Sequence, residues 1–350
     1  MPNWLRNVFV IQALVCTPVL AATVGAQDAA TFDSDGTAHI SRVIPEPALV
    51  SKEARAWLDS LTRLNRGPQT LAERRAATDK WRAKDSAEAL KHYPVVIHPT
   101  TLGDVPVDEI SPLQMPAQNR SRVFINLHGG GFNSDSGSRI EGDPIANLAR
   151  TEVISVYYRL APEHPFPAAV DDVVAVYRAL LKTYAPKNIA IYGTSAGAIL
   201  TCEVTLRLKQ LKLPLPGALG VFSGLGDFSR VSDSRQLYTL DGLPGMLQPT
   251  DPSRLPDDEY VGRTSRRDPV LSPLFADLSG LPPTLLVTST RDMLLGDTTT
   301  LHRALLRQGV DARLVVFEAL PHAFWYHFEF PETREALELM AHFLDSAVGH

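Results

Sequence analysis

Apolar runs and amphipathic stretches alternate along most of the chain. Short apolar runs are typical of buried strands, and apolar residues at three- and four-residue spacing are typical of helices. Their repeated alternation predicts an α/β fold, with a mostly parallel sheet and helices on both of its faces. The predicted strands are residues 122–127, 153–158, 188–192, 218–222, 284–288 and 312–317, and the predicted helices are residues 165–184, 196–211, 298–308 and 332–347.

Two segments depart from this alternation. Residues 51–64 and 70–89 have helical periodicity, and they precede a predicted hairpin of residues 95–97 and 105–110. Residues 227–273 are rich in Ser, Asp, Pro and Gly. The predicted helices 51–64 and 70–89 form either part of a lid or a plain structural pair. Residues 227–273 form either the other half of this lid or a long surface loop. The expected organisation is a leader and cap helices in 27–94, a catalytic domain in 95–226 and 274–350, and a cap insertion in 227–273.

The N-terminus has the pattern of a secretory signal peptide in residues 1–26. Arg6 is followed by an apolar run over residues 8–20 and then by small residues, with a cleavage position after Ala26. The run is too short to span a membrane, although an uncleaved anchor remains an alternative. We therefore expect a periplasmic or secreted protein with a loose leader in residues 27–44. Cleavage would leave Cys202 as the single cysteine, which we expect to be a buried core residue.

Composition places few limits on the function. The chain has 350 residues, of which 44% are hydrophobic and 21% are charged, and a formal net charge of −5. These values fit one large α/β domain with an appendage, or two domains. They give no reason to expect a nucleic acid or an anionic membrane as a partner.

Candidate chemistry centres on Gly193-Thr194-Ser195-Ala196-Gly197, between a predicted strand and a predicted helix. A serine between two glycines at a strand-to-helix turn is a nucleophile elbow, although such short matches also occur by chance in surface turns. The turn leaves no room for side chains at the flanking glycines, and the start of the helix provides free N–H groups for an oxyanion.

A serine nucleophile needs a base, and in this fold the order along the chain is serine, acid, histidine. His322 follows the predicted strand 312–317 in a loop, where a base could reach Ser195. Of the histidines after Ser195, His302 and His342 fall within helical patterns instead. His322 is therefore the predicted base.

The acid that orients this base should also follow a strand. Asp292 lies just past the predicted strand 284–288. Its competitor, Asp297, precedes a helical stretch and fits a helix N-cap better. Asp292 is therefore the predicted acid.

The glycines of His128-Gly129-Gly130-Gly131 follow another predicted strand. Successive glycines allow main-chain N–H groups to face a substrate, so Gly129, Gly130 and Ala196 are the expected oxyanion donors. His128 is expected to brace the loop, because no partner ligand stands at a spacing that suits a metal. A phosphate-binding loop is disfavoured, since no Gly-Lys-Ser/Thr ending follows.

These motifs resemble the hormone-sensitive lipase family of esterases, within the α/β-hydrolase fold. The resemblance covers residues 95 to the C-terminus, with the preceding helices placed like the family's cap. It departs from many members at Met293, where they have proline, and at Ala323, where they have glycine. The matching segments are His128–Phe132, Tyr158–Ala169 and Gly193–Gly197.

The resemblance implies an eight-stranded sheet, a mixed cap, and no metal or organic cofactor. It also implies short- to medium-chain esters as substrates. The stretch 290–305 looks like a bacterial branch that includes ε-lactone hydrolases and acetyl hydrolases. A serine carboxylesterase, with a small-molecule ester as its partner and a homodimer as a possible state, is the leading hypothesis. A lactone, carbamate or amide hydrolase with the same triad is the alternative.

A ligand-binding protein on the same scaffold is a minor alternative. Plant gibberellin receptors resemble the family but lack the catalytic histidine, whereas His322 is present here.

Overall fold

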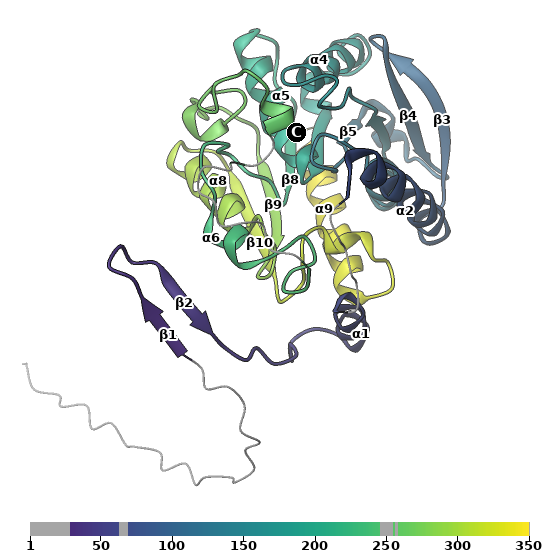
Figure 1. The fold of residues 1–350 in the computed structure, drawn as a ribbon. Coiled ribbons are helices and arrows are strands. Elements are labelled where there is room, and N and C mark those ends of the chain that lie inside the picture. Colours follow the sequence, from purple (N-terminus) through teal and green to yellow (C-terminus); the bar gives the residue numbers. More distant parts are fainter. Residues whose placement is uncertain (1–28, 63–68, 246–254, 256–257, 350) are drawn as a thin grey trace, which may run out of the picture. The chain divides into compact units, whose positions relative to one another are not determined.

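The computed structural model describes residues 29–62, 69–245, 255 and 258–349 (Figure 1). The predicted signal peptide lies outside the described residues, as do parts of both predicted cap segments. The chain divides into two units, residues 1–46 and 47–350. In the first unit, strands β1 (Ala29–Phe32) and β2 (Ala38–Ser41) pair as an antiparallel hairpin. The expectation of a loose leader in residues 27–44 is therefore wrong for this stretch.

Within the second unit, eight strands form one sheet, as expected for an α/β-hydrolase fold. Their order is β10-β9-β8-β7-β5-β6-β4-β3, and β4 is antiparallel to both of its neighbours while the other pairs are parallel. All predicted strands are confirmed, and most of their observed ends lie within two residues of the predicted ends. The largest difference is in the first strand of the hairpin, which was predicted to end at residue 97 and ends at residue 102. The strands are β3 (Val95–Leu102), β4 (Val105–Pro112), β5 (Val123–Leu127), β6 (Glu152–Val156), β7 (Ile189–Thr194), β8 (Ala218–Phe222), β9 (Thr284–Ser289) and β10 (Ala312–Phe317).

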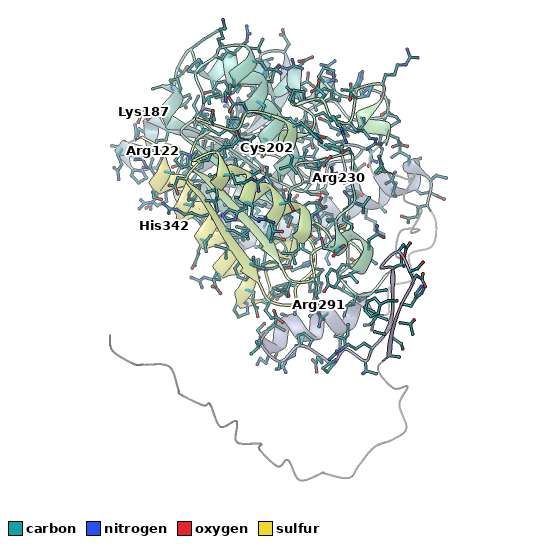
Figure 2. All side chains as sticks on the ribbon, turned by 90° about the vertical axis from the view of Figure 1, so that its left-hand side faces the viewer. Arg122, Lys187, Cys202, Arg230, Arg291 and His342 are labelled. Carbon is teal, nitrogen blue, oxygen red and sulfur yellow. The ribbon has the colours of Figure 1, made fainter. Side chains whose placement is uncertain are left out.

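Helices cover both faces of this sheet (Figure 1). One apolar core joins α4, α5 and α8 to one face, and a second core joins α3 and α9 to the other. Cys202 of α5 is buried in the first core, as expected (Figure 2). The helices are α1 (Lys52–Leu61), α2 (Leu71–His92), α3 (Ser138–Ala149), α4 (Ala168–Leu180), α5 (Ala196–Gln210), α6 (Asp233–Leu237), α7 (Asp258–Val261), α8 (Leu295–Arg307) and α9 (Pro331–Ala347), with 3-10 turns η1 (Ala117–Ser121), η2 (Pro186–Asn188), η3 (Pro273–Phe275) and η4 (Phe324–Tyr326).

The two N-terminal helices α1 and α2 pack beside elements that carry the candidate chemistry. The ring of Trp57 in α1 lies 4.1 Å from that of His327, in the segment that follows His322. Helix α2 packs against α3. In the insertion, Tyr260 of α7 is buried and stacks on Phe132 with 3.4 Å between ring centroids. Both predicted cap segments thus contact the surroundings of the glycine loop or the histidine loop. No helix within the described ranges is long and apolar enough to cross a membrane.

Candidate active site

The serine motif forms a sharp turn between β7 and α5. Ser195 has φ 58° and ψ −119°, a backbone conformation that is rare for a non-glycine residue, and its N–H donates to Phe222 O at 2.9 Å. A Cβ at Gly193 or Gly197 would overlap with the carbonyl oxygen of Leu127 at the end of β5. The flanking glycines are therefore required by the neighbouring strand, because the elbow packs directly onto the start of the glycine loop.

Asp292 and His322 lie together at the ends of β9 and β10. His322 Nδ1 is 2.9 Å from Asp292 Oδ1, so Nδ1 carries the hydrogen and Nε2 remains available as an acceptor. The Asp292 side chain is fully buried, and its other oxygen accepts from the hydroxyls of Ser223 and, at 3.0 Å, Thr288. Leu294 N–H donates to Oδ1 at 2.8 Å. This carboxylate is saturated with donors.

Burial raises the pKa of the Asp292 carboxyl, but the charge and hydrogen bonds of its partners outweigh burial and lower it below the ordinary value. His322 is the first of these partners, followed by the Ser223 hydroxyl and the Leu294 N–H. Asp292 is therefore ionised at neutral pH and can hold the His322 ring in one tautomer.

Asp297 is not beside His322. It is the third residue of α8 and not its N-cap, which is Leu294, so the expected capping role is wrong. The helix begins earlier than its Thr-rich run suggested, because Asp292 already accepts from Leu294 N–H and, through its main-chain oxygen, from Leu295 N–H. The Asp297 carboxylate instead accepts from Ser232 Oγ at 2.7 Å.

Ser195 is connected to this pair through β8. Its N–H bonds to Phe222, and the next residue, Ser223, donates to Asp292. The segment after His322 returns to the elbow, since Trp325 Nε1 donates to Thr194 Oγ1 at 3.1 Å. Among the described residues no hydrogen bond joins Ser195 Oγ to His322, which is common in unliganded sites whose contacts tighten around substrate.

The glycine loop lies against the elbow. A Cβ at Gly129 would lie 3.4 Å from Ser195 Cβ and 3.1 Å from Thr194 O, so any larger residue would fit tightly against the elbow. Gly130 and Gly131 have φ of 114° and 60°, which turn the chain sharply after β5. Gly129 thus lies next to Ser195, and Ala196, the residue after Ser195, is the first of α5.

His128 supports this loop from within. Its ring stacks on Tyr158 at 4.1 Å, its Nδ1 lies 2.7 Å from Gly129 O, and Tyr158 OH donates to His128 O at 2.6 Å. Asp135 closes the far end of the loop, because its Oδ1 accepts from the N–H groups of Gly137 and Ser138 at 3.1 and 3.0 Å. The sequence indicated His128 but not Asp135, which lies two residues before Gly137, the N-cap of a helix that the sequence did not predict.

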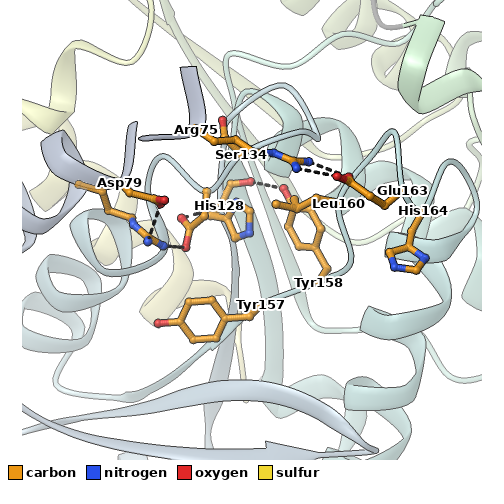
Figure 3. A pocket seen from close by; sticks show the side chains of 11 residues that line it. Arg75, Asp79, His128, Ser134, Tyr157, Tyr158, Leu160, Glu163 and His164 are labelled. Carbon is orange, nitrogen blue, oxygen red and sulfur yellow. Dashed lines mark hydrogen bonds and ion pairs between the residues drawn. The ribbon is translucent and has the colours of Figure 1, made fainter. Parts of the chain in front are cut away.

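Two arginines of α2 attach that helix to the outer side of the loop (Figure 3). Arg75 donates to Asn133 O at 2.6 Å and binds Glu163 through two contacts of 2.7 and 2.8 Å. Arg82 bonds to Asp79 at 2.9 Å and to Asp135. They border a pocket of about 470 Å³, whose lining residues are Arg75, Asp79, Arg82, His128, Ser134, Asp135, Tyr157, Tyr158, Leu160, Glu163 and His164.

One group in the described part of the chain has the composition of a metal site. Ligand atoms of Glu88, His92 and Glu329 lie within 4.8 Å of one another. Glu88 already pairs with Lys91 at 2.6 Å and with His92 at 3.3 Å, and His92 and Glu329 are exposed. This surface cluster is separate from the serine, aspartate and histidine described above.

Known proteins share these features. Residues 124–326 match the alpha/beta hydrolase fold family. An acetyl-hydrolase of Streptomyces hygroscopicus is 34% identical over 241 residues, which cover 67% of this chain and 79% of that protein. The crystal structure of esterase E25 has a TM-score of 0.76 at 31% identity and covers 88% of this chain and 98% of its own. A hormone-sensitive lipase from a metagenome library has a TM-score of 0.72 at 30% identity, with 86% and 100% covered.

The match extends over more than half of the chain and over most of each relative, and it includes the elbow, the glycine loop and the histidine loop. Relatives named as esterases and acetyl-hydrolases show that the protein is a carboxylic ester hydrolase. The chain belongs to the alpha/beta hydrolase family, among the bacterial esterases that resemble hormone-sensitive lipase.

Proposed function

We propose that the protein is a serine carboxylesterase that hydrolyses short- to medium-chain esters through an acyl-enzyme on Ser195. The observation that carries this proposal is the buried pair of Asp292 and His322, 2.9 Å apart, joined through Ser223 and Phe222 to a serine held at a strained strand-to-helix turn. A buried, ionised carboxylate that fixes one histidine tautomer serves to orient a base beside a nucleophile.

The chemistry follows from these positions. His322 Nε2 accepts the proton of Ser195 as Oγ attacks the ester carbonyl carbon. The tetrahedral intermediate collapses, and the alcohol leaves with the proton from His322. Water then attacks the acyl-enzyme, gives its proton to His322, and releases the acid as Ser195 recovers its hydrogen. Asp292 stays ionised throughout and stabilises the imidazolium.

Main-chain N–H groups would stabilise the oxyanion. Gly129, Gly130 and Ala196 are the proposed donors, because the glycine loop and the start of α5 converge beside Ser195. The Phe132 ring is clamped by Tyr260, and His128 by Tyr158, so both ends of the loop are rigid before substrate arrives.

Gly130→Val should lower kcat/KM by about 100-fold or more, equivalent to about 3 kcal/mol of transition-state stabilisation. A side chain there would overlap with Ser134 O, and φ of 114° suits only glycine, so the donor must move. Gly131→Asn is the matched control, since the nearest atom to its Cβ would be 4.0 Å away and Asn tolerates its φ of 60°. Equal losses in both variants, or an unchanged kcat/KM in Gly130→Val, would contradict the proposed role of Gly130.

The acyl preference can be read directly from a series of p-nitrophenyl esters from acetate to palmitate. We expect the highest kcat/KM between two and eight acyl carbons, as suggested by the relative named acetyl-hydrolase and by a related esterase whose crystals were soaked with p-nitrophenyl butyrate. The eight-carbon limit is an order-of-magnitude estimate, about the length that a pocket for a small ligand encloses. Fastest turnover of palmitate would refute the short-chain assignment, and no turnover of any ester by folded protein would direct the search to lactones and amides.

A further inference from the structure

Glu141 of α3 is a buried carboxyl that the mechanism above does not use. It is 3% exposed, and its Oε1 accepts from the hydroxyl of Tyr326. Within the described residues its Oε2 has no hydrogen-bond partner. A buried polar atom without a partner reduces stability, so a carboxyl retained in this position requires an explanation.

The carboxyl lies where three loops of the site meet. Tyr326 belongs to η4, the turn that directly follows the His322 loop. The hydroxyl of Thr194, the residue before Ser195, and the N–H of Gly129 lie near enough to the Glu141 carboxyl to lower its pKa. A single side chain on α3 therefore bonds to the turn after the histidine loop and lies beside the nucleophile elbow and the glycine loop.

The packing around this carboxyl is close on the side of Gly137. A Cβ on Gly137 would overlap with Glu141 Oε1 and lie 2.6 Å from the hydroxyl oxygen of Tyr326. Tyr192 OH, from β7, holds the main-chain oxygen of Glu141 at 3.4 Å. Trp325 fixes the Thr194 hydroxyl from the other side. Movement of any one of the three loops would disturb the same carboxyl.

The groups around Glu141 favour its uncharged form. The pKa of its carboxyl rises from the ordinary 4.5 to about 8, chiefly because the group is buried. Tyr326, Thr194 and Gly129 oppose this rise, and the negative charge of Asp135 adds to it.

Other charged groups near α3 are engaged with one another. Asp135 lies between Arg82 of α2 and, at 3.7 Å, His128 Nδ1. Asp143, two residues beyond Glu141 in α3, pairs with Arg139 at 3.1 Å. The arginines that approach α3 are thus bound to aspartates.

We propose that Glu141 is a positioning residue which, as the uncharged acid, holds the elbow, the glycine loop and the histidine loop in register for catalysis. Its ionisation would switch the site to a less active state. The inference deepens the proposed function and rests on it, because it assumes an oxyanion beside Gly129. An ionised Glu141 would compete with that oxyanion for the Gly129 N–H and would oppose the developing negative charge in a buried site.

The test is the pH dependence of kcat and KM with p-nitrophenyl butyrate for the wild type and Glu141→Gln. In the wild type, kcat should fall about tenfold per pH unit above a midpoint near pH 8, with KM little changed. Glu141→Gln keeps the shape and the neutral charge, so it should retain most of kcat at pH 7 and lose the alkaline decline. An alkaline decline with the same midpoint in Glu141→Gln would overturn the proposal.

Tyr326→Phe provides a second test that leaves the carboxyl in place. The Tyr326 hydroxyl lowers the pKa of Glu141, so its removal should move the alkaline midpoint upward. Glu203→Gln is the matched control: Glu203 is another fully buried carboxyl with a raised pKa, on α5, bonded by Tyr260. Its alkaline midpoint should equal that of the wild type. A shift in Glu203→Gln without one in Tyr326→Phe would contradict the assignment to Glu141.

A ¹³C NMR titration of the side-chain carboxyls separates this inference from the proposed function. The Glu141 signal, assigned by its absence in Glu141→Gln, should titrate near pH 8 whether or not esters are turned over. Titration near 4.5 would overturn the inference and leave the esterase proposal intact. Titration near pH 8 in a protein that hydrolyses no ester would instead reject the proposed function and, with it, the catalytic role of Glu141.

Discussion

Ser195→Ala is expected to lower kcat for p-nitrophenyl butyrate by roughly 10⁴- to 10⁶-fold while the fold stays intact. The loss is large because the hydroxyl forms the covalent intermediate, and no other group at the elbow can replace it. KM should change little, since the side chain contributes little to binding the ester. Residual activity above water would come from the oxyanion donors alone. The measurement is initial-rate kinetics with enough enzyme to detect the residual rate.

Ser346→Ala is the control for this variant. Ser346 is exposed on α9 and bonds only to Phe343 O at 3.1 Å within the described residues, so its removal should leave kcat unchanged. Circular dichroism and the melting temperature of Ser195→Ala should match the wild type. If Ser195→Ala retained wild-type turnover, Ser195 would not be the nucleophile and the acyl-enzyme mechanism would be refuted.

The sheet and the core of the site could be predicted from the sequence because their signals are local. Each buried parallel strand is a continuous apolar run, and the fold's chemistry follows the ends of strands. Asp292 and His322 were therefore found from their positions after β9 and β10. Gly193 and Gly197 could be singled out because a tight turn of this kind has no room for a side chain at either position. The atom that excludes a side chain, Leu127 O, is nevertheless distant in sequence.

Helix α3 was missed because local propensity argues against it. It contains Gly142 and Pro144, which both disfavour helix interiors. The helix nevertheless forms because nine of its residues are buried, against α2, α9 and the sheet, and this packing outweighs the cost. The hairpin of β1 and β2 was missed because its strands have only four residues each and bury none of them. Local contacts hold its turn, such as the bond from Thr37 N–H to Asp35 at 2.9 Å.

The residues that support the site carry no sequence signal of their own. Ser223 reaches Asp292 across 69 positions, and Tyr326 reaches Glu141 across 185. A serine after an apolar strand or a glutamate in an unrecognised helix is an ordinary residue until the fold brings its partner close. Local pattern thus predicts the candidate reactive groups, whereas the groups that surround them emerge from tertiary contacts.

Asp292→Asn should lower kcat by about 10³- to 10⁴-fold, the second-largest effect expected. An asparagine has the size of the aspartate, so Ser223, Thr288 and Leu294 can still surround it. Its amide, however, carries no charge to stabilise the His322 imidazolium and can present an N–H to Nδ1, which would favour the tautomer with the hydrogen on Nε2. That tautomer cannot accept the proton of Ser195. The measurement is the kcat–pH profile from pH 6 to 10.

Asp297→Asn is the matched control, because the two aspartates are five positions apart and both are buried. Asp297 bonds to Ser232 and not to the histidine, so its replacement should change kcat by only a few-fold. The two variants therefore separate the loss of an orienting carboxylate from the loss of any buried negative charge at the start of α8. A large loss in Asp297→Asn together with a small one in Asp292→Asn would reverse the assignment. Comparable losses in both would show that the charge of the region, and not the bond to His322, supports the base.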